Sequence, residues 1–269
     1  MDKTDSLFAG SIPEVYDQFM VPLMFTDYAA DMARRVAALH PGAVLETAAG
    51  SGVVTRALAR LLPPGVRYVA TDLNGAMLAR AEVRQADGVA VTWQVADAQD
   101  LPFAAASFDV VCCQFGVMFF PDRIAAYAQA LRVLTPGGQF LFNAWGPVGD
   151  NGFAATAEQA ILAHYGAGGP QFISKVPHGY FDADRIRADL TAAGFQKVDI
   201  DAVSYDSRAA RAEDVAMALC QGTPMRHEIL SREPEGLAPV TAVVAAAVRA
   251  RYGSGSVVAP MRALMVTAR

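Results

Sequence analysis

Residues that build disulfide and metal sites are scarce in this chain. Its 269 residues include three cysteines and four histidines, and two of the cysteines are adjacent, Cys112 and Cys113. Neither a Cys-x-x-Cys pair nor a His-x-x-x-His spacing occurs, so we expect no disulfide framework and no catalytic metal. Cys112 and Cys113 lie within an apolar run and are expected to be buried thiols.

Basic charge and long apolar runs are also lacking. Asp and Glu outnumber Lys and Arg by 27 to 22, and the net charge of −5 leaves no positive field for nucleic acid. No apolar run reaches the ~18 residues of a spanning helix, and the first residues lack a signal-peptide core. We therefore expect a cytoplasmic protein that acts on a small molecule, with neither a membrane span nor a nucleic-acid partner. Its alanine-rich helices are compatible with a homodimer.

The rest of the chain is organised around Ala43 to Gly52, A-V-L-E-T-A-A-G-S-G. A short apolar run ends in a glycine-rich turn, and helical spacing of Val54, Leu58 and Leu61 follows it. This pattern predicts a strand, a tight loop and a helix. Glycines 50 and 52 let the backbone approach a ligand without an intervening Cβ, and the helix start offers unpaired N–H groups.

Two further apolar runs end in an acidic residue, V-R-Y-V-A-T-D-L at Asp72 and V-A-V-T-W-Q-V-A-D-A at Asp97. The carboxyl ends of parallel strands meet at one edge of a sheet and form a ligand crevice there. Asp72 lies about 20 positions after the glycine turn, as an acidic ribose partner should, although it could instead cap the next helix. Asp97 could equally be a turn residue. Thr55 occupies the third glycine position of the dinucleotide pattern, which argues against an NAD(P)-dependent oxidoreductase.

Five motifs in this order resemble those of class I S-adenosylmethionine-dependent methyltransferases, in particular the small-molecule group that includes quinone and sterol methyltransferases. They are E-T-A-A-G-S-G, A-T-D-L-N-G-A-M-L, V-A-D-A-Q-D-L-P-F, S-F-D-V-V and L-R-V-L-T-P-G-G-Q-F. The resemblance implies an α/β fold, a doubly wound, mostly parallel, Rossmann-like sheet of seven strands with helical insertions. It also implies that S-adenosylmethionine is the cofactor, S-adenosylhomocysteine the product, and a small hydrophobic or aromatic metabolite the methyl acceptor.

The same resemblance assigns roles to individual residues. Tyr16 would reach the methionine carboxylate, Met77 would lie against the adenine ring, and Asp97 would accept from the adenine amino group while the Ala98 backbone reads a ring nitrogen. Gln114 ends the central strand, where the methyl group would lie. Glu46 and Ala48 stand where the family often has Asp and Gly. The complete predicted cofactor-binding set is Tyr16, Glu46, Ala48, Gly50, Gly52, Asp72, Leu73, Met77, Asp97, Ala98 and Gln114.

We predict one methyltransferase domain over residues 1–269, divided into N-terminal cover helices (1–41), a cofactor-binding core (43–145) and two substrate-side insertions (146–181 and 206–256). Within it, one helix should bury Met32, Val36 and Leu39, and the helix of residues 121–134 should turn Ile124, Ala128 and Leu131 inward. Both insertions exceed plain connections in length, so they should fold as helices and define the substrate.

Methyl transfer from a sulfonium requires alignment and exclusion of water, with a general base only if the acceptor must lose a proton. Of the candidate bases His178, His164 and His227, the first is preferred because it precedes Tyr180 on the substrate side. A structural role is the alternative for each. Since the reaction has no obligatory catalytic side chain, a non-catalytic, cofactor-binding regulatory protein of the same fold also fits the sequence.

Overall fold

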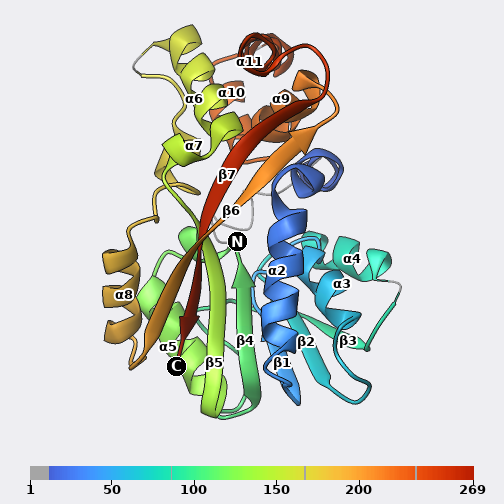
Figure 1. Ribbon diagram of the computed structural model, residues 1–269, viewed down its shortest axis with the longest axis vertical. Coiled ribbons are helices and arrows are strands. Elements are labelled where there is room, and N and C mark those ends of the chain that lie inside the picture. The colour runs from blue at the N-terminus through green and yellow to red at the C-terminus, as the bar shows by residue number, and fades with distance from the viewer. Residues whose placement is uncertain (1–11, 86, 167, 234) are drawn as a thin grey trace. The chain divides into compact units, whose positions relative to one another are not determined.

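The computed structural model describes residues 12–269, apart from residues 86, 167 and 234 (Figure 1). The chain forms two compact units, which are described separately. One unit contains residues up to Thr26 together with Trp145–Gly179 and Ser204–Arg262, and we call it the helical unit. The other contains Asp27–Ala144, Tyr180–Val203 and Ala263–Arg269, and we call it the sheet unit.

A seven-stranded sheet with the order β3-β2-β1-β4-β5-β7-β6 organises the fold. Strands β1 to β5 pair in parallel, and β6 and β7 form the antiparallel hairpin at one edge (Figure 1). The predicted doubly wound, mostly parallel sheet is therefore confirmed. Strand order reverses between β1 and β4, and such switch points are where open α/β sheets bind ligands. The strands are β1 Ala43–Glu46, β2 Arg67–Asp72, β3 Val91–Val95, β4 Phe108–Gln114, β5 Leu134–Trp145, β6 Val198–Ala209 and β7 Val257–Ala268.

Helices cover the sheet on two faces. On one face, Met32 and Val36 of α2 and Leu58 of α3 join Val44 and Cys112 in a buried cluster. On the other face, Tyr127 of α5 stacks on Phe142 of β5, with ring centroids 5.4 Å apart. The helices of this layer are α2 Thr26–Ala37, α3 Val53–Ala59, α4 Gly75–Arg84, the 3-10 turn η2 Val117–Phe119, α5 Arg123–Val133 and α8 Ala183–Ala192.

The predicted inward faces of these helices were partly wrong. Helix α5 buries Ala126, Tyr127, Ala130 and Val133, while Ile124 and Ala128, both predicted to face inward, are exposed. The predicted inward set did not include Tyr127, whose ring is buried and whose hydroxyl donates to that of Tyr180 (3.3 Å). Leu39 and Leu61 are exposed because α2 ends at Ala37 and α3 at Ala59, before either leucine.

The helical unit contains the helices that precede Thr26, all but the last two residues of the first insertion and the whole of the second. The predicted helical character of both insertions is confirmed. Helix α11 packs against α6 and α9, and α9 packs against η1, a π-helix of ten residues. Within the described part of the chain, no helix is both long and apolar enough to cross a membrane. The elements are α1 Ile12–Val15, η1 Tyr16–Phe25, η3 Val148–Asp150, α6 Gly152–Tyr165, α7 Phe172–Lys175, α9 Ala212–Gln221, α10 Met225–Leu230 and α11 Ala238–Tyr252.

Candidate functional site

The turn after β1 runs through the left-handed region of backbone space. Its φ angles are +51° at Ala48, +56° at Gly50 and +76° at Gly52. A Cβ on Gly52 would lie 2.9 Å from the Cβ of Ala81, so glycine lets α3 begin close to α4. Ala48 adopts a conformation that costs a residue with a Cβ about 1 kcal/mol. The turn thus presents bare backbone at the carboxyl end of β1.

Asp72 ties the end of β2 to this turn. The Gly50 amide donates to its Oδ2 and the Asn74 amide to its Oδ1, both at 2.8 Å. A carboxylate oxygen can accept more than one hydrogen bond. Asn74, rather than Asp72, caps α4, since its side chain accepts from the amides of Ala76 and Met77. Asn74 therefore has the capping role that was the alternative for Asp72.

Met77 and Asp97 lie at the same edge of the sheet. The Met77 methyl is 3.7 Å from where a Cβ on Gly50 would lie, and its side chain is buried. The Ala96 amide donates to the Asp72 carbonyl at 3.1 Å, which brings the end of β3 beside that of β2. Asp97 Oδ1 accepts from the Gln99 amide two residues later (2.8 Å), so Asp97 does form a turn, as the alternative from the sequence expected. Leu73 and Ala98 are the half-buried neighbours that follow Asp72 and Asp97.

Glu46 is buried at the end of β1 and faces the core of the sheet unit. Its Oε2 accepts from the Thr55 hydroxyl at 2.7 Å and from the Tyr68 hydroxyl. Burial raises the pKa of Glu46 from 4.5 to about 7, against the two hydrogen bonds, which favour the charged form. The sequence did not predict that Thr55 and Tyr68 donate to Glu46. Thr55 was expected only as the residue that breaks the dinucleotide pattern.

The end of the central strand β4 brings two amide side chains into register. Gln114 is paired with Asn143 of β5, and the Phe115 amide donates to the Asn143 carbonyl at 3.2 Å. Phe115 has a φ of +50° and packs edge-to-face on Tyr28, with centroids 5.2 Å apart. Sequence reasoning missed Asn143, whose signal was one amide within the apolar run Q-F-L-F-N-A-W.

Tyr16 and His178 belong to the helical unit. Tyr16 begins η1 and stacks on Phe25 with centroids 5.3 Å apart. His178 is 3% exposed, and its Nδ1 lies 2.8 Å from the Gly146 carbonyl oxygen. Because a carbonyl can only accept, Nδ1 donates and the ring's lone pair is on Nε2. Burial lowers the pKa of His178 from 6.5 to about 4, so the neutral imidazole is a weak base. This environment favours a structural role.

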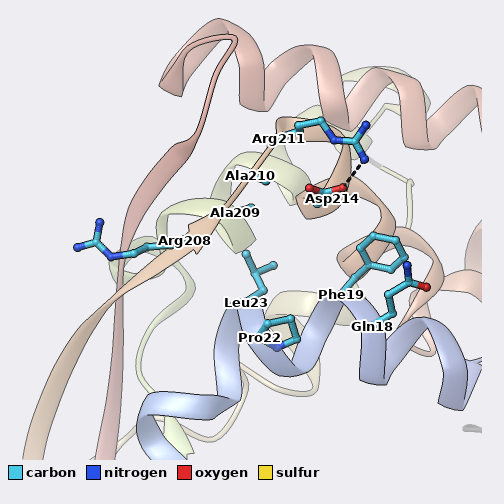
Figure 2. A pocket seen from close by; sticks show the side chains of 9 residues that line it. All are labelled: Gln18, Phe19, Pro22, Leu23, Arg208, Ala209, Ala210, Arg211 and Asp214. Carbon is cyan, nitrogen blue, oxygen red and sulfur yellow. Dashed lines mark hydrogen bonds and ion pairs between the residues drawn. The ribbon is translucent and has the colours of Figure 1, made fainter.

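A pocket of about 330 Å³ lies within the helical unit, between the π-helix η1 and the end of β6 (Figure 2). Part of its lining is apolar and consists of Phe19, Pro22 and Leu23. Arg211 pairs with Asp214 at 2.9 Å, and Arg208 pairs with Asp206 at 2.7 Å. Both guanidinium groups thus have a carboxylate partner, and both arginine side chains are exposed.

Three features meet in the sheet unit: a bare backbone turn after β1, an acidic residue at the end of β2 and a reversal of strand order between β1 and β4. They define the fold of a class I S-adenosylmethionine-dependent methyltransferase. Residues 44–138 also match the family model described as a methyltransferase domain.

Individual proteins share parts of this architecture. The ubiquinone/menaquinone biosynthesis C-methyltransferase UbiE of Stutzerimonas stutzeri is 34% identical over 143 residues, which are 52% of this chain and 51% of that protein. The phosphoethanolamine N-methyltransferase 2 of Haemonchus contortus, solved with phosphomonomethylethanolamine and S-adenosylhomocysteine, has a TM-score of 0.59 at 16% identity, covering 98% of this chain and 59% of that one. The (4+2)-cyclase SpnF has a TM-score of 0.53 at 20% identity, covering 90% and 80%. The matched segment spans about half, or less, of the curated relatives' length.

Proposed function

We propose that this protein transfers a methyl group from S-adenosylmethionine to a small hydrophobic or aromatic metabolite. The observation that carries the proposal is the Asp72 carboxylate, which accepts from the Gly50 and Asn74 amides beside a turn whose residues 50 and 52 lack a Cβ. That arrangement fits an adenosine whose ribose hydroxyls donate to Asp72. The match of residues 44–138 to a methyltransferase domain supports the same cofactor.

The remaining cofactor assignments follow from position. Met77 lies where an adenine ring over Gly50 would contact it, and Asp97 and Ala98 follow the next strand. The structure gives no support to the expected attraction between Glu46 and the methionine ammonium, because the Glu46 carboxyl is buried and accepts from Thr55 and Tyr68. Tyr16 remains the proposed partner of the methionine carboxylate. S-adenosylhomocysteine in the Haemonchus contortus enzyme supports a cofactor of this kind on this fold.

The proposed acceptor is uncharged and largely apolar. The pocket of the helical unit is lined by Phe19, Pro22 and Leu23 of η1 and by residues 208–211 and 214, and its two arginines each have a carboxylate partner. The similar UbiE is a C-methyltransferase of ubiquinone/menaquinone biosynthesis, which favours a ring-bearing acceptor. Because that relative is matched over about half its length, the acceptor is inferred for this chain and not transferred from it.

Catalysis in this proposal rests on positioning. When bound, S-adenosylmethionine supplies an activated methyl on a positively charged sulfur, and that sulfur leaves as a neutral thioether. The chain's own residues hold the adenosine at Asp72 and exclude water with the apolar end of β4, where Phe115 and Tyr28 pack. A proton released by the acceptor would go to a base or to solvent. His178 Nε2 is the candidate from the sequence, though its lowered pKa makes it weak.

The experiment is single-turnover methyl transfer from isotopically labelled S-adenosylmethionine to a panel of quinols, phenols and other small ring compounds. Labelled product with the wild type and little with Asp72→Ala is the expected result. Cofactor binding without transfer to any compound would favour the regulatory alternative. The (4+2)-cyclase SpnF shares this fold, so methyl transfer itself must be measured.

A further inference from the structure

Asn143 of β5 is a fully buried amide without hydrogen-bond partners on its side chain. It is 0% exposed, and neither Oδ1 nor Nδ2 has a partner among the described residues. A buried amide normally finds partners, because leaving one unpaired is costly. Its counterpart Asn151 shows the usual case, since it is 1% exposed and donates to the Pro147 carbonyl at 3.0 Å while accepting from the Arg262 amide at 3.0 Å. The Asn143 side chain therefore has a donor and an acceptor that no described residue uses.

The register of β4 and β5 tells which way Asn143 faces. Cys112 pairs with Leu141, and both belong to the buried cluster under α2 and α3. Gln114 pairs with Asn143 two residues further along both strands. Because side chains alternate along a strand, Asn143 faces the same side as Leu141, just beyond that cluster and opposite the last residue of β4. This is the carboxyl edge of the sheet, where ligands of open α/β folds bind.

The strand order separates Asn143 from the adenosine half of the site. Asp72 ends β2 and Asp97 lies just after β3, and both strands are on one side of the point between β1 and β4 where the strand order reverses. Asn143 is on β5, on the other side of it (Figure 1). A molecule that extends from Asp72 to the end of β4 therefore places its reactive end toward β5. The group that meets Asn143 belongs to the second reactant.

We infer that the Asn143 amide binds a hydroxyl group of the methyl acceptor, an inference that rests on the proposed function. An amide offers both a donor and an acceptor, and a hydroxyl satisfies both at once. An ionised group would need a counter-charge at this depth, whereas the residues that the strand register and backbone pairing place beside Asn143 are the neutral Gln114, Phe115 and Leu141. Since Asn143 is fully buried, we expect binding to displace a covering side chain.

Replacement of the amide gives a test that needs no knowledge of the acceptor. Asn143→Leu removes unpaired polar atoms, so the ligand-free protein should unfold at a higher temperature than the wild type. Asn151→Leu, the matched control, removes paired atoms and should lower the unfolding temperature by several degrees. If Asn143→Leu lowers it as Asn151→Leu does, Asn143 is a structural residue and the inference is overturned.

Binding of matched compounds tests the ligand chemistry. Phenols and naphthols, each beside its methyl ether, are titrated into the protein saturated with S-adenosylhomocysteine. The wild type should bind the hydroxylated member of at least one pair tenfold or more tightly. Asn143→Leu should lose that preference while keeping its affinity for S-adenosylhomocysteine. A wild type without any hydroxyl preference, or a preference that survives in Asn143→Leu, overturns the inference alone. A wild type that does not bind S-adenosylhomocysteine overturns the proposed function, and this inference with it.

Discussion

Glu46 makes the stability of the sheet unit depend on pH. Its carboxyl is buried at the end of β1, and its pKa is raised to about 7 from the 4.5 of an exposed glutamate. The folded protein therefore binds a proton more tightly than the unfolded chain does. The stabilisation this gives is complete below pH 4.5 and is lost as the pH rises through 7.

The size of the effect follows from the two pKa values. A shift from 4.5 to about 7 corresponds to about 3 kcal/mol, at roughly 1.4 kcal/mol per unit. Glu46→Gln carries no proton to gain or lose at this site. We therefore expect the free energy of unfolding of Glu46→Gln, minus that of the wild type, to increase by about 3 kcal/mol between pH 4.5 and pH 8.

Urea denaturation at several pH values measures this difference, in which the titration of all other groups cancels. Glu82→Gln is the control, because it makes the same chemical change on an exposed helix position and leaves the buried Glu46 carboxyl in place. If Glu46→Gln also gives a constant difference, Glu46 is ionised throughout, and the argument that its burial outweighs the Thr55 and Tyr68 hydrogen bonds is refuted.

Three further predictions concern the site. Asp72→Ala should weaken S-adenosylhomocysteine binding tenfold or more, about 1.4 kcal/mol by calorimetry, while the exposed Asp184→Ala leaves it unchanged; equal affinities in all three proteins would contradict the ribose role. Ala48→Gly should raise the free energy of unfolding by about 1 kcal/mol, because glycine adopts a φ of +51° without strain, and a lower value would show that the turn is not strained. His178→Gln should abolish the stability loss that the wild type shows as the pH falls from 6.5 to about 4; a loss of methyl transfer in a stable His178→Gln protein would instead support a catalytic base.

Much of the sheet was predictable because each strand and the helix after it have a local sequence pattern, an apolar run followed by a turn and helical spacing. The apolar runs that end at Glu46, Asp72 and Gln114 became β1, β2 and β4, and the glycine turn adopted the left-handed angles that glycine favours. Order and spacing of such motifs fix a doubly wound sheet because crossovers are right-handed and connections are short.

Side-chain partners at the site were less predictable, since they depend on residues far apart in sequence. Glu46 looked open to the cofactor, but Tyr68, 22 residues later, donates to it within the core. The apolar residues of α5 fit two different buried faces. The face that contains Tyr127 is the one that is buried, and there Tyr127 stacks on Phe142. Asn143 could not be recognised because an unpaired amide is a property of the packed structure.

The central claim is that the turn after β1 and the Asp72 carboxylate bind an adenosyl sulfonium cofactor. Calorimetric titration of the purified protein with S-adenosylmethionine, S-adenosylhomocysteine and NADH in parallel tests it most directly. We expect micromolar binding of the first two, about −8 kcal/mol, and none of NADH. Binding of NADH alone, or of none of the three, would contradict it.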